Sequence, residues 1–187
     1  MTLFEFLAVF LSIVLSFGVI RLLDGLPSAL KRGRGYVIHT LWVISVLFMH
    51  VQYWWVFWSY STVVEWNYPR FLIVLASPFL TYSLTTALVP VDHGTVESWR
   101  DHFCRVRTRF FVLYACWWLV VALANLIVLG QPFMNGLRLF QATFIVLYTL
   151  GAISKRPWFH ALLVAYTIGV IVFTVTFLFL DPAPLIP

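Results

Sequence analysis

Six long apolar stretches, separated by short polar breaks, make up almost the whole chain. A helix needs about 20 mostly apolar residues to cross the hydrocarbon core of a bilayer. The breaks are rich in glycine, proline and asparagine, which commonly end helices and form turns. The pattern predicts six transmembrane helices, at about 3–23, 36–58, 70–90, 107–130, 134–153 and 157–180.

The breaks are too short to separate domains, so we expect one transmembrane domain over residues 1–187. The predicted fold class is an all-α integral membrane protein, a six-helix bundle built from three helical hairpins. Composition agrees, because 62% of the residues are hydrophobic, only 10% are charged and the mean hydropathy is +0.94. Soluble domains carry about 25% charged residues. The first apolar run has no basic segment before it and is too long for a signal peptide, so we expect it to remain as a membrane helix.

The basic residues predict how the bundle is oriented. Ten of the twelve lie around the first, third and fifth connections, and only Arg70 and Arg138 lie near the others. Short cytoplasmic loops carry an excess of Lys and Arg, so we expect the odd-numbered connections to be cytoplasmic and both termini to lie outside. In a bacterium this would be the plasma membrane. The net charge of +5 is thereby explained by topology, and no nucleic-acid partner is expected.

A few polar side chains interrupt the apolar runs at similar predicted depths. Polar groups in a bilayer are costly, usually face the bundle interior and often mark function. The sharper interpretation is a polar layer near the outer face that lines a path for a ligand or ion, with Glu5 and His50 as a proton-sensitive pair. The alternative is that these groups only bond helices together, at about 0.6 kcal/mol each. The candidates are Glu5, His50, Gln52, Asn125 and Gln141.

The third apolar run contains a proline among hydroxyl residues. Pro78 lacks a backbone N–H and is expected to bend the helix. Hydroxyls at Thr81, Ser83 and Thr85 are candidates to satisfy the freed carbonyl, as often happens in membranes. We therefore predict a central, bent third helix, which acts either as a hinge or pore-lining element or as a closely packed structural one.

The segment from residue 50 to 58, HVQYWWVFW, is unusually aromatic. Tryptophan and tyrosine favour the headgroup region of a bilayer, so an aromatic belt accounts for Trp54, Trp55 and Trp58. A cage for a cationic ligand is the alternative.

Motifs for chemistry are missing from the sequence. The two cysteines lack a metal-ligand or redox spacing, and His50 is the one deeply placed histidine, which disfavours a bis-histidine haem. We therefore expect no metal, no cofactor and no enzyme activity. The leading prediction is a multi-pass protein that transports, conducts or senses a small solute or ion, as a channel or transporter. The alternative is a non-catalytic accessory or scaffolding subunit of a larger membrane complex. In either case the expected partners are the lipid bilayer and a homo-oligomer or other membrane subunits.

Overall fold

A computed structural model describes residues 2–178, and this part of the chain is helical throughout apart from its connections. Six of the helices are long and apolar enough to cross a membrane, which confirms the prediction of an integral, multi-pass membrane protein. The last two residues of the sixth predicted helix lie outside the described part. The helices are α1 (Leu3–Ala29), α2 (Val37–Phe57), α3 (Tyr68–Leu88), α4 (Trp99–Ile127), α5 (Gly136–Ile153) and α6 (Pro157–Phe173).

Three short helical segments extend or join these elements. The 3-10 helix η1 (Trp58–Thr62) continues α2, and the π-helical η3 (Thr174–Leu178) continues α6. The 3-10 turn η2 (His93–Thr95) lies in the connection from α3 to α4. The second span therefore runs from Val37 to Thr62, four residues beyond its predicted end.

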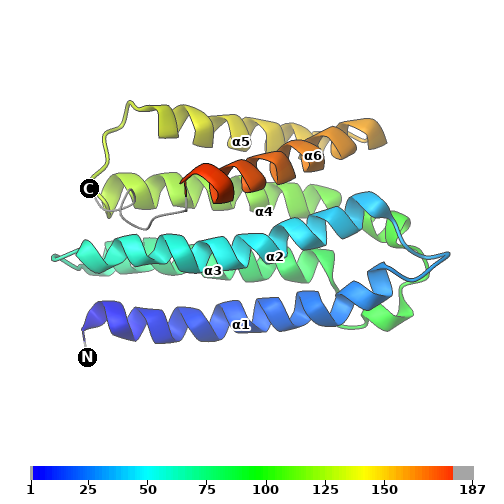
Figure 1. The fold of residues 1–187 in the computed structure, drawn as a ribbon, viewed down its shortest axis with the longest axis horizontal. Helices are drawn as coiled ribbons and strands as arrows, with labels where there is room; N and C mark the ends of the chain where they lie inside the picture. Colours follow the sequence, from blue (N-terminus) through cyan, green and yellow to red (C-terminus); the bar gives the residue numbers. More distant parts are fainter. Residues whose placement is uncertain (1, 179–187) are drawn as a thin grey trace.

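Consecutive helices run in opposite directions, as Figure 1 shows. We call the end with the connections α1–α2, α3–α4 and α5–α6 the basic end, and the end where α1 begins the N-terminal end. Helix α3 lies in the middle of the bundle, packed on α1, α2 and α4. The most extensive packing joins α4 to α5, and α6 packs on α2. Figure 1 shows α6 running obliquely to the other helices. The predicted central position of the third helix is confirmed by these contacts.

Two helices are longer than their apolar runs predict. Helix α1 continues through Pro27 to Ala29. Helix α4 begins at Trp99 instead of residue 107, because Ser98 caps it by accepting a hydrogen bond from the backbone N–H of Asp101, at 3.2 Å. The hydropathy pattern detects only the membrane-crossing part of such a helix, so the charged first turns of α4 were missed.

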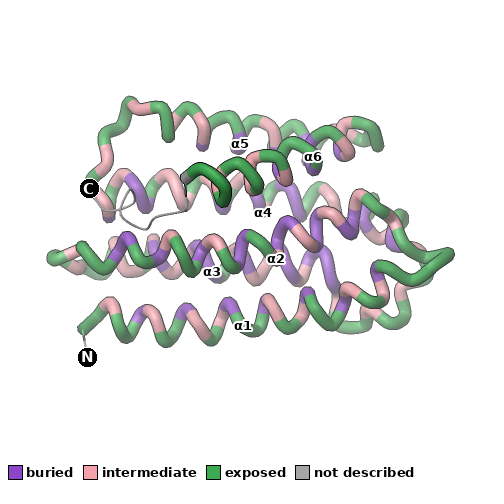
Figure 2. Tube along the Cα trace, in the orientation of Figure 1, coloured by how far each residue is buried: buried purple, intermediate pink, exposed green. Residues whose placement is uncertain are grey.

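An aromatic cluster fills the centre of the bundle. The ring of Trp42 on α2 is fully buried and lies 5.3 Å from Phe110 and 5.2 Å from Phe111, centroid to centroid. Tyr114 stacks on Tyr148 at 4.2 Å and so joins α4 to α5. Half of the apolar window of α2 and of α3 is buried, against 22% for α1 and α6. Figure 2 shows this concentration of buried positions in the middle helices, which leaves α1 and α6 with broad exposed apolar faces.

Three histidines hydrogen-bond to backbone carbonyls where helices end at the basic end. The carbonyl of Leu88, at the end of α3, accepts hydrogen bonds from Nε2 of His39 at 3.0 Å and of His102 at 3.1 Å. The carbonyl of Ser154, just after α5, accepts one from Nε2 of His160 at 2.9 Å. These rings therefore pair the carbonyls that a helix end leaves without an intrahelical donor.

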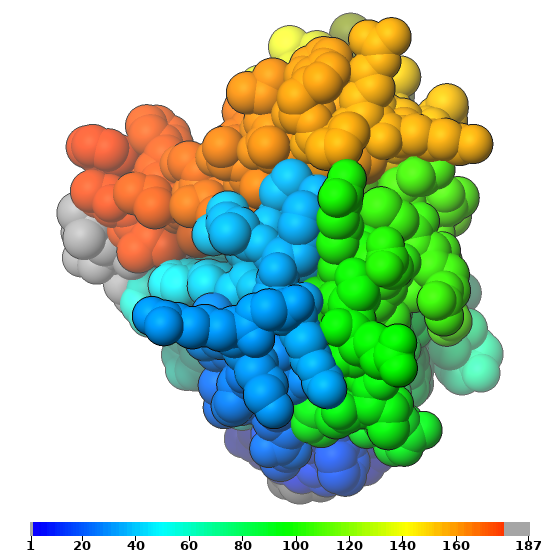
Figure 3. Space-filling view, turned by 90° about the vertical axis from the view of Figure 1, so that its right-hand side faces the viewer, coloured from blue at the N-terminus to red at the C-terminus, as the bar shows by residue number. Residues whose placement is uncertain are grey.

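The connections at the basic end also hold one another. The backbone N–H of Trp99 donates to the carbonyl of Arg34 at 3.1 Å, and its indole N–H donates to the carbonyl of Ser28 at 2.9 Å. Figure 3, a view onto the basic end, shows the α1–α2 connection lying directly beside the start of α4. Hydrogen bonds therefore join the α1–α2 connection and the end of α1 to the start of α4.

Pro78 lies inside α3, and a hydroxyl from another helix supplies the donor that it lacks. A regular helix would pair the carbonyl of Val74 with the N–H of residue 78, which proline does not have. The phenolic hydroxyl of Tyr53, on α2, donates to this carbonyl at 3.2 Å. Tyr53 is buried, with 6% of its surface exposed. The freed carbonyl is therefore satisfied across the α2–α3 interface and not by the predicted hydroxyls of α3.

This contact generates a prediction that a double-mutant cycle can test. Tyr53→Phe removes only the hydroxyl and should lower the free energy of unfolding by about 1 kcal/mol or more, since Val74 is left with an unpaired buried carbonyl. In a Pro78→Ala background the N–H of residue 78 returns, and Tyr53→Phe should cost much less. Denaturant unfolding in detergent micelles measures both steps. Equal costs in the two backgrounds would show that the hydroxyl does not compensate for the proline.

Candidate functional site

The predicted polar layer does not form one site, and Glu5 illustrates this first. Its carboxylate accepts a hydrogen bond from the backbone N–H of Thr2 at 2.8 Å, while Thr2 Oγ1 accepts one from the N–H of Glu5 at 3.2 Å. This reciprocal pair is a capping box, which stabilises the first turn of α1. Glu5 is exposed at the N-terminal end of the bundle.

His50 lies far from Glu5, in the contact between α1 and α2. Its ring is fully buried, and Nδ1 bonds the carbonyl of Val46, one turn back, at 2.7 Å. Nε2 has no hydrogen-bond partner and points at Gly18 of α1. Gly18 and Glu5 are 13 residues apart, so about 20 Å of helix separates His50 from Glu5. The expectation of a neighbouring Glu5–His50 pair is wrong, because α2 continues through η1 and His50 is deeper than its predicted end implied.

The three amide candidates show no hydrogen bond to one another. Gln52 donates from Nε2 to Oγ1 of Thr174 at 3.1 Å, which fastens α2 to η3. Gln141 is buried on α5, and its Oε1 accepts a hydrogen bond from Nη1 of Arg138 at 2.7 Å. Asn125 is buried near the end of α4, where its backbone carbonyl accepts from the N–H of Gln131 at 3.0 Å. Gln52 therefore joins two helices, whereas Gln141 bonds within its own helix.

The hydroxyl ladder of α3 bonds to its own helix. Thr81 donates to the carbonyl of Ser77 at 2.9 Å, and Thr85 to the carbonyl of Thr81 at 3.2 Å. Ser83 donates to the carbonyl of Phe79 at 2.8 Å. Thr81 and Thr85 are fully buried. Back-bonding of this kind lets hydroxyl residues sit inside a tightly packed membrane helix.

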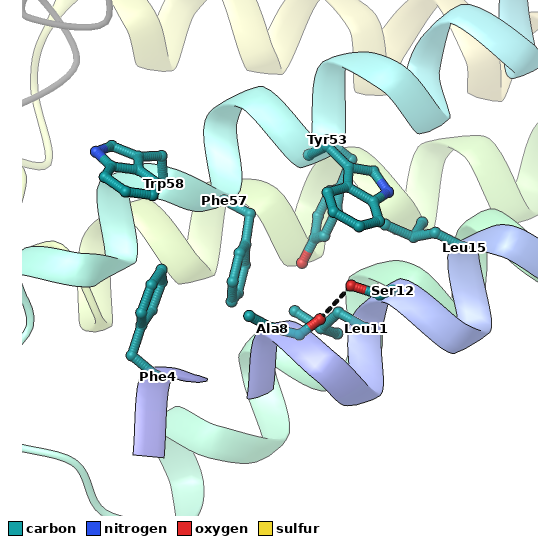
Figure 4. A pocket seen from close by; sticks show the side chains of 9 residues that line it. Phe4, Ala8, Leu11, Ser12, Leu15, Tyr53, Phe57 and Trp58 are labelled. Carbon is teal, nitrogen blue, oxygen red and sulfur yellow. Dashed lines mark hydrogen bonds between the residues drawn. The ribbon is translucent and has the colours of Figure 1, made fainter. Parts of the chain in front are cut away.

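An apolar groove that the sequence reasoning missed lies between α1 and α2, near the N-terminal end (Figure 4). Its cavity measures about 230 Å³. Phe4 and Phe57 stack across it at 5.0 Å, and Ser12, which donates to the carbonyl of Ala8 at 2.5 Å, lies on its α1 side. The lining residues are Phe4, Ala8, Leu11, Ser12, Leu15, Tyr53, Trp54, Phe57 and Trp58.

The character of the groove follows from this lining. The hydroxyl of Ser12 is already engaged, so the groove offers hydrocarbon and aromatic surface and can hold an apolar group, not a hydrated ion. The signal in the sequence was the spacing of small residues at Ala8 and Ser12, one helical turn apart, opposite the aromatic end of α2.

Comparison with protein-family models, with curated proteins and with solved structures finds no match in any of the three. Within residues 2–178, no three His, Cys, Asp or Glu side chains gather in a way that could hold a metal ion.

The approach of His50 to Gly18 generates the second prediction. A Cβ at position 18 would lie 2.2 Å from Nε2 of His50, which is too close for any side chain. Gly18→Ala should therefore destabilise the fold by about 1–3 kcal/mol, and it should cost far less when His50 is also replaced by Ala. Thermal unfolding in micelles measures the effect.

Gly169 provides the matched control. It lies in α6, and a Cβ there meets no atom within 4 Å. Gly169→Ala should be neutral or stabilise by about 0.5–1 kcal/mol, the usual gain for a helical glycine. If Gly18→Ala cost the same with and without His50, the close helix contact would not depend on this pair.

Proposed function

We propose that this protein is a non-catalytic accessory subunit of a membrane complex, in which its helices pack against those of a partner. The observation that carries the proposal is that the polar candidates engage different neighbours and not one another. A solute pathway requires polar groups to converge on a water-filled cavity, whereas Gln52, Gln141 and His50 each engage a different neighbour. Groups used in this way stabilise a bundle and leave little polar surface for a passing ion.

The groove between α1 and α2 is the contact surface that we assign to the partner. Helices in membranes associate through close van der Waals packing, and small residues at the contact allow their backbones to approach. Ala8 and Ser12 provide such small positions, and the rings of Phe4, Phe57 and Trp58 form the walls on either side. An apolar transmembrane helix of another chain, or of a second copy, fits this lining.

The proposal includes an arrangement in the membrane. Three hairpins, each with its basic connection in the cytoplasm, place both termini outside, because Lys and Arg concentrate at the basic end. This orientation puts the groove in the outer half of the bilayer. It also places Trp54 and Trp58 toward the outer headgroups, where their rings are favoured.

Blocking the groove tests the partner contact. Ala8→Phe should shift the tagged full-length chain, solubilised gently from native membranes, from a large complex toward its own mass on native gels. We expect the complexed fraction to fall at least about fivefold, since overpacking an interface costs about 1 kcal/mol or more. Ile13→Phe is the control, because Ile13 lies on α1, 52% exposed and outside the groove. Light scattering of the purified chain then distinguishes a second copy from another protein.

Flux measurements test the competing hypothesis of a solute or ion pathway. Proteoliposomes that contain the purified chain should pass protons, Na⁺ and K⁺ no faster than empty ones. A flux that depended on the chain and was lost in His50→Gln or Gln141→Leu would overturn the accessory-subunit proposal in favour of transport. If the Ala8→Phe variant stayed in the complex as fully as Ile13→Phe, the groove would not be the contact surface for the partner.

The orientation is tested by single cysteines in a background where Cys104 and Cys116 are replaced by Ser. Ser61, at the N-terminal end, and Gly94, at the basic end, are both exposed. A Cβ at Gly94 meets nothing within 4 Å, so a cysteine fits there. An impermeant thiol reagent added to intact cells should label Ser61→Cys and spare Gly94→Cys until the membrane is opened. The reverse pattern would invert the topology.

A further inference from the structure

Arg138 carries buried donors that the fold does not use. Its Nη1 donates to Oε1 of Gln141 at 2.7 Å, but Nε and Nη2 are buried and have no hydrogen-bond partner. A buried, unpaired charged donor is among the most expensive groups that a protein can hold. Arg70, the other arginine near the N-terminal end, instead donates from Nη1 to the nearby carbonyl of Glu65 at 2.6 Å.

The two unused nitrogens belong to one edge of the guanidinium. Nε–H and one N–H of Nη2 point the same way and form the fork that binds two oxygens of a carboxylate or phosphate at once. The hydrogen bond from Nη1 to Gln141 fixes the orientation of the guanidinium from the opposite edge. Arg138 is therefore oriented for an oxyanion.

The position of Arg138 in α5 also favours an oxyanion. It is the third residue of the helix, and its backbone N–H is capped by Oδ1 of Asn135 at 2.9 Å. The N-terminus of a helix has a partial positive charge, so an arginine there is unfavourable alone, while an anion is favoured. No Asp or Glu occurs between Val128 and Gln141 to supply that anion from the adjoining chain.

The depth of Arg138 in the bilayer and the side chains around it indicate that the oxyanion belongs to a lipid. The 18 residues of α5 span about 27 Å, nearly the whole hydrocarbon thickness of about 30 Å, so Arg138 lies at the boundary with the lipid headgroups. The side chains of Phe133, Met134 and Leu139 nearby are 69%, 83% and 73% exposed. They offer apolar surface beside the charged fork, as an amphiphile requires.

We propose that the Nε–Nη2 edge of Arg138 binds the phosphate of a membrane phospholipid at the N-terminal end of the bundle. The edge is buried in the fold, so neighbouring protein atoms move aside as the phosphate enters. The ligand is held by a specific pair of hydrogen bonds and not by general attraction to a basic surface. This site is independent of the proposed partner contact at α1 and α2.

Native mass spectrometry of the purified full chain in detergent provides the test. The probes are phosphatidylglycerol and a galactolipid with the same acyl chains but no phosphate. Arg138→Gln should weaken phosphatidylglycerol binding about tenfold, the value of one charge-assisted hydrogen-bonded contact, and leave galactolipid binding unchanged. Arg70→Gln, which removes the same charge at the same end, should change phosphatidylglycerol binding less than about twofold. Arg138→Lys keeps the charge without the fork and should recover only part of the affinity.

Several outcomes would overturn the proposal. Equal binding of the two lipids would show that the phosphate is not recognised. Equal losses in Arg138→Gln and Arg70→Gln would indicate unspecific attraction. Competition by millimolar inorganic phosphate would assign the fork to a soluble anion, whereas its failure to compete supports a lipid. Release of a bound protein by Arg138→Gln, with lipid affinity unchanged, would assign the fork to a carboxylate of a partner. If Arg138→Gln does not fold, Arg138→Lys decides between these results.

Discussion

The structure depends on one constraint, that polar groups inside the hydrocarbon must find partners within the protein. In the described part of the chain, several side chains meet it by bonding to backbone carbonyls. Tyr53 pairs the carbonyl that Pro78 frees, and His39 and His102 share the carbonyl of Leu88 where α3 ends. Thr81 and Thr85 return their hydroxyls to their own helix. Several polar residues that look functional in the sequence therefore serve as internal hydrogen-bond partners.

Helix α3 gains its central place from the same constraint. A helix that carries a proline and several hydroxyls is costly against lipid, but it is stable where neighbours supply donors and close packing. It packs on α1, α2 and α4, and the bond from Tyr53 ties its weakest point to α2. The more uniformly apolar α1 and α6 can face lipid, and they have the least buried windows of the six.

Two features are left unused by the internal packing and hydrogen bonding, and they differ in chemistry. The groove between α1 and α2 has apolar and aromatic walls and lies along two helices, which suits another helix. The fork of Arg138 has two buried donors and lies at the end of a short helix, which suits an oxyanion. The proposed roles of partner packing and lipid binding are compatible, since the two surfaces are on different helices.

The sequence by itself determined the class of protein and the number of spans. Hydropathy over a window of about 20 residues has a direct physical meaning in a bilayer, so six apolar runs predict six crossing helices. It also located the aromatic residues at the end of α2 and the proline in α3. The predicted ends were less accurate at α1 and α4, because capping by Ser98 and continuation through Pro27 leave no mark on hydropathy.

Only the tertiary structure decided which polar residues meet. Depth along a helix is a single coordinate, and residues at similar depth can point in different directions or lie on helices that do not touch. His50 faces Gly18 instead of Glu5, because rotation about each helix axis and the choice of neighbouring helices set that contact. The same reason hid the unpaired edge of Arg138. Its residue type is plain in the sequence, but whether a donor is paired depends on atoms that only packing brings together.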